Sequence, residues 1–173
     1  MPKMGLDFGL NSVNVCAKRK FRWLFVIPGI SADGSAEGVN SLPPQRGARP
    51  SVTFKEITAE HLNETIYYPG KPDWKPVELS LYDLKKSNHP VFSWLQRMYQ
   101  PSSGNYQPPL DNGFIMPQAD LYLYDGCGNI LEHWVYENVW PATIEFGELD
   151  MGDSEIVTCD LTLRYARAYL REG

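Results

Sequence analysis

Hydrophobic and polar residues alternate along several short runs of the chain, and the clearest alternation is "IVTCDLTLRYARAYL" at residues 156–170. Successive side chains of a β-strand point to opposite faces, so this run predicts a final strand with one buried face. The apolar set is Val157, Cys159, Leu161, Leu163 and Tyr165, and the opposite set is Thr158, Asp160, Thr162 and Arg164.

Other runs predict further strands. "WKPVELSLYDL" places Val77, Leu79 and Leu81 on a buried face and Glu78, Ser80 and Tyr82 on the other. "FRWLFVIPGI" has the content of a buried strand that ends at Pro28. "SVTFKEITAEHLNETIYYPG" predicts two strands, 51–59 and 64–69, that form a projecting hairpin.

The second half of the chain predicts two more strands joined at residues 126–129, in "ADLYLYDGCGNILEHWVYENVW". We expect the second of them to end at Trp140 and Pro141. A further strand through Ile144 and Phe146 then leads, by an acidic turn, into the final strand.

One segment changes period. In "HPVFSWLQRMYQP" the apolar residues Val91, Trp94, Leu95 and Met98 recur at helical spacing, and Pro90 suits a first helical turn. About seven strands and one helix predict a mainly β fold, an antiparallel β-sandwich or barrel with one flanking α-helix.

Two segments predict long connections, residues 31–50 and 101–118, because they are rich in proline, glycine and small polar residues. Residues 1–20 show little periodicity and are interpreted as an N-terminal arm ending in the basic cluster "KRKFR". A solvated strand entrance and a contact with an acidic neighbouring chain both fit this cluster. The length of 173 residues suits a single domain spanning 1–173.

Charge and composition argue against several classes of protein. The net charge of −5 gives no overall positive field to hold a phosphate backbone, so a sequence-reading DNA-binding protein is not expected. The longest apolar stretch is far shorter than a membrane span, and the first residues do not have the pattern of a signal peptide. Three cysteines without a CxxC motif indicate neither a disulfide framework nor a zinc site. We expect a soluble, cytosolically made protein with no membrane association.

No catalytic motif is found. The histidines are isolated, and His133, inside a strand, is interpreted as structural. Glu145, Glu148 and Asp150 lie close together, but a solvated turn does not separate carboxylate pKa values as acid–base catalysis requires. We therefore expect no enzyme activity, no metal site and no cofactor. The aromatic and acidic residues leave one alternative open, a β-barrel domain that binds a small ligand or carbohydrate.

The order of elements in the C-terminal half resembles the tail tube proteins of contractile-tailed bacteriophages. The matching stretch is "WPATIEFGELDMGDSEIVTCDLTLRY", and the upstream strand, loop, hairpin, strand and helix follow the same order over residues 21–167. Related folds form the tubes of R-type pyocins and of the type VI secretion system.

This resemblance implies a structural virion protein whose homohexameric rings stack into the inner tube of a contractile tail. The implied partners are other copies of the chain, the tail sheath protein, tape-measure and baseplate or tail-terminator proteins, and double-stranded DNA in passage during ejection. The implied location is the virion tail, assembled in the host cytoplasm. An alternative within the same family is a baseplate-proximal initiator or adaptor ring.

Within this family the residues suggest two surfaces. A tube that passes DNA should not hold it, so we expect a polar, partly acidic lumen lining. The lumen-facing candidates are Glu78, Ser80, Thr158, Asp160 and Thr162. We expect inter-subunit contacts at the hairpin, the 31–50 loop and the acidic turn. The candidates there are Arg46, Arg49, Glu56, His61, Glu64, Glu148, Asp150, Asp153 and Glu155.

Overall fold

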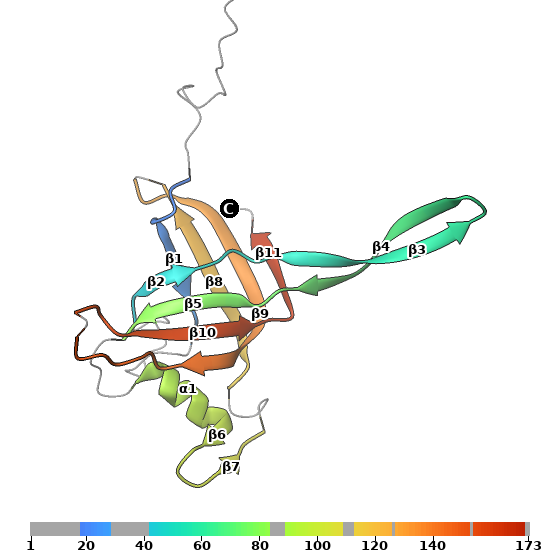
Figure 1. Cartoon of the computed structure of the whole chain (residues 1–173). Helices are drawn as coiled ribbons and strands as arrows, with labels where there is room; N and C mark the ends of the chain where they lie inside the picture. The colour runs from blue at the N-terminus through green and yellow to red at the C-terminus, as the bar shows by residue number, and fades with distance from the viewer. Residues whose placement is uncertain are drawn as a thin grey trace, which may run out of the picture.

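The computed structural model describes residues 18–28, 42–83, 89–108, 113–125, 127–152 and 154–171, without the side chain of His61. Within these ranges the chain forms antiparallel sheets and one helix, which confirms the predicted class (Figure 1). Seven strands follow the spatial order β1-β8-β9-β10-β5-β2, with β11 also beside β9. Their bounds are β1 Trp23–Val26, β2 Pro44–Gly47, β5 Val77–Tyr82, β8 Met116–Tyr124, β9 Ile130–Glu145, β10 Thr158–Arg164 and β11 Arg167–Arg171.

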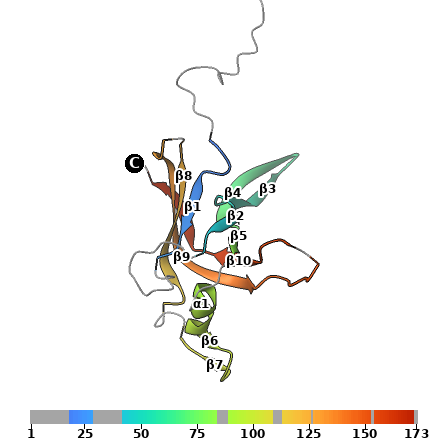
Figure 2. The same ribbon diagram turned by 90° about the vertical axis from the view of Figure 1, so that its left-hand side faces the viewer.

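The strands form two layers that share β9. Layer 1 contains β1, β8, β11 and the first part of β9, whereas layer 2 contains β2, β5, β10 and the last part of β9. Figure 2 shows the two layers side by side, with α1 beneath them. The ends of the strand order, β1 and β2, lie in different layers and are not paired with each other, so the barrel has an open seam there.

The predicted strand end at Trp140 and Pro141 is wrong, because β9 continues to Glu145. Pro141 lies opposite Leu163, and the register then skips Ala142, which forms a bulge. Proline is tolerated at bulges, where one ladder hydrogen bond is already missing. Asn138, three residues earlier, has a φ of 54°, and these irregularities mark the bend by which β9 passes from layer 1 to layer 2.

The predicted final strand bends in the same place. β10 and β11 keep one register along β9, from Arg164 opposite Trp140 to Arg167 opposite Glu137. The two strands are separated only by residues 165–166, and even there the Ala166 N–H donates to the Glu137 carbonyl at 2.9 Å. The segment after Tyr165 is thus a paired strand of layer 1.

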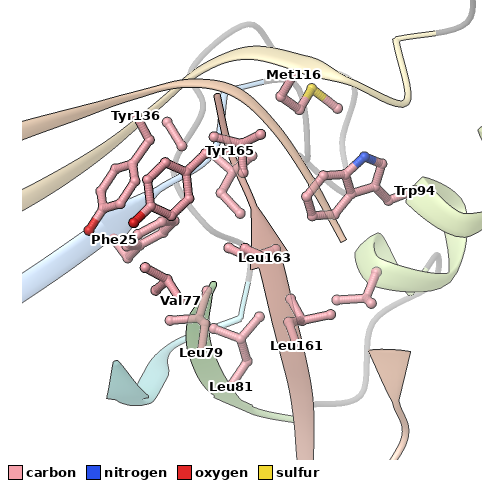
Figure 3. Close-up of a cluster of buried hydrophobic side chains, with 14 of the residues drawn as sticks. Phe25, Val77, Leu79, Leu81, Trp94, Met116, Tyr136, Leu161, Leu163 and Tyr165 are labelled. Carbon is pink, nitrogen blue, oxygen red and sulfur yellow. The ribbon is translucent and has the colours of Figure 1, made fainter. Parts of the chain in front are cut away.

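The core lies between the layers, where the predicted apolar faces of β5 and β10 are buried (Figure 3). Cys159 and Leu163 are fully buried, and burial raises the pKa of the Cys159 thiol to about 11. Tyr136 and Tyr165 meet edge to face with ring centroids 5.0 Å apart. The apolar residues of these two strands that were predicted to face the core, and are buried there, are Val77, Leu79, Leu81, Cys159, Leu161 and Leu163.

The predicted helix is α1, Pro90–Met98, which packs against the core through Val91 and Trp94. Proline occupies its first turn, and the His89 side chain accepts a hydrogen bond from the Phe92 N–H as the N-cap. The indole N–H of Trp94 donates to the Phe114 carbonyl at 2.7 Å, which anchors the helix to the segment before β8.

The predicted hairpin is formed by β3, Val52–His61, and β4, Glu64–Trp74, both longer than the sequence suggested. It continues the β2–β5 pair and extends away from the layers (Figure 1). Trp74 at its base packs on Tyr165, with ring centroids 5.8 Å apart.

Parts of the two predicted loops are strands. β2 lies within 31–50 and pairs with β5, whereas residues 31–41 fall outside the described residues. Within 101–118, β7, Asn105–Tyr106, pairs with β6, Tyr99–Gln100, and β8 begins at Met116. These strands lack an alternating pattern because they are short edge strands or ends of longer ones. Most of the predicted arm, residues 1–17, is also outside the described residues.

Candidate functional site

The outer face of layer 2 is polar and brings the five predicted lumen residues together. Glu78 lies directly opposite Thr162, and Ser80 directly opposite Asp160. Paired residues of antiparallel strands share a face, so these side chains form one surface, named here the polar face, with Thr158 beside them. Pairing adds three polar residues that the sequence could not assign without the register: Arg46, Thr143 and Glu145. Arg164 belongs to the outward set already predicted for the final strand, and Tyr82 and Trp140 lie on the same face, opposite Thr158 and Arg164.

The polar face carries three carboxylates (Glu78, Glu145, Asp160) and two arginines (Arg46, Arg164), so its net charge is slightly negative. Glu78 is exposed, whereas Asp160 is half-buried among its neighbours. Hydroxyl groups of serine and threonine make up much of the rest. Such a surface offers a polyanion no continuous positive strip.

The hairpin has one apolar and one polar face. Ile57 pairs with Tyr68, and Ala59 with Ile66, on the side named here the apolar hairpin face. Ile57 is 56% exposed and Tyr68 51% exposed. Side chains of this size are normally covered, and an isolated two-stranded hairpin is marginally stable in water. This face is therefore suited to contact with another molecule.

The predicted contact residues of the hairpin are not clustered. Glu56 lies on the polar side, because it alternates with Ile57, and Glu64 lies on the other side, opposite His61 in the register. Both carboxylates belong to exposed residues. The side chain of His61 is outside the described residues, so its predicted contact stays a prediction.

The acidic segment, residues 146–156, joins β9 to β10, and its described residues, 146–152 and 154–156, form no strand. It carries Glu148, Asp150 and Glu155 on exposed residues, whereas Asp153 is outside the described residues. The Asp150 carboxylate accepts a hydrogen bond from the Gly152 N–H at 2.8 Å. Between these acids Leu149 is 86% exposed and Met151 fully exposed. The segment thus combines negative charge with uncovered apolar side chains.

A groove of about 510 Å³ lies at the seam between β1 and β2 and is named here the basic groove. Arg46 and Arg49, both predicted contact residues, line it. Lys18, Arg19 and Lys20 of the "KRKFR" cluster, which are distant from these arginines in sequence, also line it. Trp23, Leu121 and Leu123 supply apolar lining. The complete lining is Lys18, Arg19, Lys20, Trp23, Gln45, Arg46, Gly47, Ala48, Arg49, Leu121 and Leu123.

Glu132, on the inward side of β9, holds two of these cations. Its carboxylate forms an ion pair with Lys18 and lies 3.6 Å from the guanidinium of Arg49. The Trp134 indole N–H donates to it at 3.0 Å. Burial alone would raise the pKa of Glu132, but the hydrogen bonds from Lys18 and Trp134 and the two positive charges lower it overall.

His89 and His133, the two histidines whose side chains are described, have structural partners. His133 Nε2 lies 2.7 Å from Asp120 Oδ1, and its ring stacks on Tyr122 with centroids 4.4 Å apart. His89 caps α1 and lies 3.1 Å from Asp83 Oδ1. Across the described ranges, no three histidine, cysteine or acidic side chains are grouped as metal ligands would be. No helix in the same ranges is long and apolar enough to cross a membrane.

Comparisons with known proteins assign the fold. No protein-family model matches the sequence, and no curated protein is significantly similar to it. Solved structures do match. The tube-terminating cap of the anti-feeding prophage has a TM-score of 0.71 at 14% identity, covering 97% of this chain and 100% of that one. A chain of the extended sheath–tube complex of PVC, an extracellular contractile injection system, has a TM-score of 0.68 at 12% identity, covering 90% and 91%.

The similarity extends to a phage tail. The SPP1 tail tube has a TM-score of 0.56 at 12% identity, covering 91% of this chain and 80% of that one. The chain therefore has the fold of the tube proteins of contractile injection systems and phage tails, as the sequence resemblance predicted.

Proposed function

We propose that this chain is a structural subunit of the inner tube of a contractile tail or injection system, and that its homohexameric rings stack around a lumen through which DNA passes in a phage. The main support is the fold similarity to the PVC sheath–tube chain, which covers at least nine-tenths of both chains. In this role the partners are further copies of the chain, a surrounding sheath protein, the tape-measure protein, and baseplate or terminator proteins at the tube ends. The place of action is the virion tail, after assembly in the host cytoplasm, and the chain has no catalytic role.

The surfaces of the chain suit this role. The polar face would line the lumen, where hydroxyls and carboxylates let a polyanion slide. The edge strand β2 and the end of β9 bound layer 2 on opposite sides, and in a ring each would lie beside the other edge of a neighbour. Such use of edges removes the unpaired strands that otherwise invite aggregation. The apolar hairpin face would then be covered by a subunit of the adjacent ring.

A second candidate is a ring at one end of the tube, at the cap or next to the baseplate as an initiator or adaptor. The observation that favours it is the TM-score of 0.71 with the anti-feeding prophage cap, whose whole length is matched. An end ring shares the lateral contacts of a tube ring but does not need to stack indefinitely on copies of itself.

Electron microscopy of the purified chain separates these functions. Long hollow tubes are expected for the repeating subunit, and single or paired rings for an end ring. A chain that stays monomeric at high concentration would contradict both and would favour a ligand-binding β-barrel. Copy number per assembled particle then distinguishes many stacked rings from one.

A further inference from the structure

We infer that the basic groove is the docking site for the acidic segment of a second copy of this chain. This inference rests on the proposed tube function, because it assigns one of the contacts through which subunits associate. The occupant is the segment at residues 146–156 of the neighbour, in which Glu148 and Asp150 supply the anions and Leu149 the apolar contact.

The groove has the chemistry of a site for an acidic peptide. Five cationic residues contribute to its lining, and no acid does among the described residues around it. Glu132 fixes Lys18 and Arg49 from below by ion pairs, which reduces the conformational entropy those side chains lose when an anion binds. The remaining cations, Arg19, Lys20 and Arg46, belong to exposed residues.

The lining is not only basic. Trp23 from β1 and Leu121 and Leu123 from β8 place apolar surface among the cations. A free anion would use the charges but leave this surface exposed to water. An occupant that uses the whole groove must bring apolar side chains next to its carboxylates.

The acidic segment has that combination. Glu148 and Asp150 alternate with Leu149 and Met151, and both apolar side chains are almost entirely exposed in the single chain. No base occurs between residues 146 and 156, so the whole segment attracts a basic surface. Burial of one leucine side chain adds free energy that exposed ion pairs alone do not supply.

The topology lets this contact occur between copies. The acidic segment leaves layer 2 from the end of β9, one edge of that layer, whereas the groove adjoins β2, the other edge. A contact between opposite edges is heterologous: each copy offers its segment to one neighbour and its groove to the other. Heterologous contacts form closed rings when the rotation between copies closes.

Double-stranded DNA is the competing occupant. It would satisfy the cations but not the apolar lining, and the chain as a whole has a net charge of −5 that opposes it. Both charge and apolar burial therefore favour the acidic segment as the occupant of the groove. The test below also measures the binding of DNA.

The first experiment measures binding of a fluorescently labelled peptide, residues 146–156, to the full chain by anisotropy at low salt. We expect saturable binding that weakens at least about tenfold with Lys20→Glu and Arg46→Glu together. The same charge change at Lys55 and Lys71 on the hairpin is the matched control and should leave binding unchanged. A peptide with Glu148→Lys and Asp150→Lys should prefer the groove variant over the wild type. Equal binding to all three proteins, no binding up to about 1 mM, or tighter binding of labelled DNA at the groove overturns the inference.

The second experiment tests the contact in assembly. Lys20→Glu with Arg46→Glu should abolish rings or tubes, as should Glu148→Lys with Asp150→Lys, and all four substitutions in one chain should restore them. If the wild type and both charge-reversed double variants all form tubes, this contact is overturned, whereas the proposed tube function is not. A wild-type chain that binds the peptide but never assembles would uphold the groove contact and contradict the tube function.

Discussion

The carboxylate of Glu132 lies 3.6 Å from the guanidinium of Arg49, across the open seam of the barrel. Glu132 belongs to layer 1, and Arg49 follows the edge strand of layer 2. These two residues are therefore a polar link between layers that are otherwise joined mainly by the shared strand β9 and the core. Lys18 adds a third charge to the link.

The first prediction concerns the pH dependence of this link. The folded-state pKa of Glu132 is lowered, so its contribution to stability is complete above the unfolded value of about 4.3 and is lost as pH falls through the folded value. Glu132→Gln should lower the free energy of unfolding by about 1–2 kcal/mol near pH 7. The difference from wild type should shrink below about pH 4. Urea titrations across pH 3–7 measure it, and a constant difference would show that Glu132 does not act through its charge.

The second prediction concerns the thiols. Cys159 is fully buried with a pKa raised to about 11, whereas Cys127 is exposed at the turn between β8 and β9. In a Cys16→Ser background at pH 8, a thiol reagent should modify Cys127 within seconds to minutes. Cys159 should react only when the chain unfolds. Reaction rates with and without denaturant check this, and rapid modification of both thiols in the native state would contradict the burial of β10.

The third prediction concerns Gly147, at the start of the acidic segment. Its φ is 69°, and an added Cβ would lie 2.4 Å from the Thr158 carbonyl oxygen. Gly147→Ala should destabilise the chain by about 2–3 kcal/mol, through backbone strain and displacement of the neighbouring strand.

Gly104 is the matched control. It has the same φ of 69° but no atom within 4 Å of the added Cβ. Gly104→Ala should therefore cost only about 1 kcal/mol, the backbone term alone. Thermal or urea unfolding of both variants separates strain from collision, and equal losses would mean that the close approach at Gly147 relaxes freely.

Strand and helix positions were largely predictable, because the faces of β5, β10 and α1 follow simple periods. The joins were not. Pro141 reads as a strand end, but a bulge lets β9 continue, and only the pairing with Leu163 reveals this. β2 has four residues and no alternation, so its place beside β5 depends on contacts distant in sequence.

Of the candidate surfaces, the sequence indicated the polar face but not the basic groove. The lumen candidates share one face because each of the two strands alternates strictly, which sequence shows directly. The basic groove combines residues 18–23, 45–49 and 121–123, which only the layer arrangement brings together. The sequence shows each of these three segments, but it does not show that they lie side by side in the fold.

The fourth prediction concerns the apolar hairpin face. Ile57→Ser with Tyr68→Ser removes an exposed apolar pair and should leave the unfolding of the core unchanged within about 0.5 kcal/mol. Stacking of rings should be lost, because the area available for burial between them falls. Electron microscopy should show single rings in place of tubes.

Tyr67 provides the control for this variant. It is 64% exposed and, paired with Thr58, lies on the opposite hairpin face. Tyr67→Ser removes a similar aromatic area without touching the apolar hairpin face, so tubes should persist. If both variants assemble normally, the hairpin does not mediate stacking.

The fifth prediction concerns the polar face as a lumen lining. Asp160→Lys with Thr162→Lys changes its charge by three units per subunit, from −1 and 0 to +1 and +1 at these positions. In a stacked tube this makes a continuous basic lining, which should retain double-stranded DNA with a steep salt dependence. DNA held inside the tube should resist nuclease, whereas wild-type tubes should protect none. Two lysines on the outer face of layer 1, at Tyr169 and Tyr124, are the control, because DNA attracted there would bind outside the tube and remain cleavable. Nuclease-sensitive DNA on tubes of both variants would place the polar face away from the lumen.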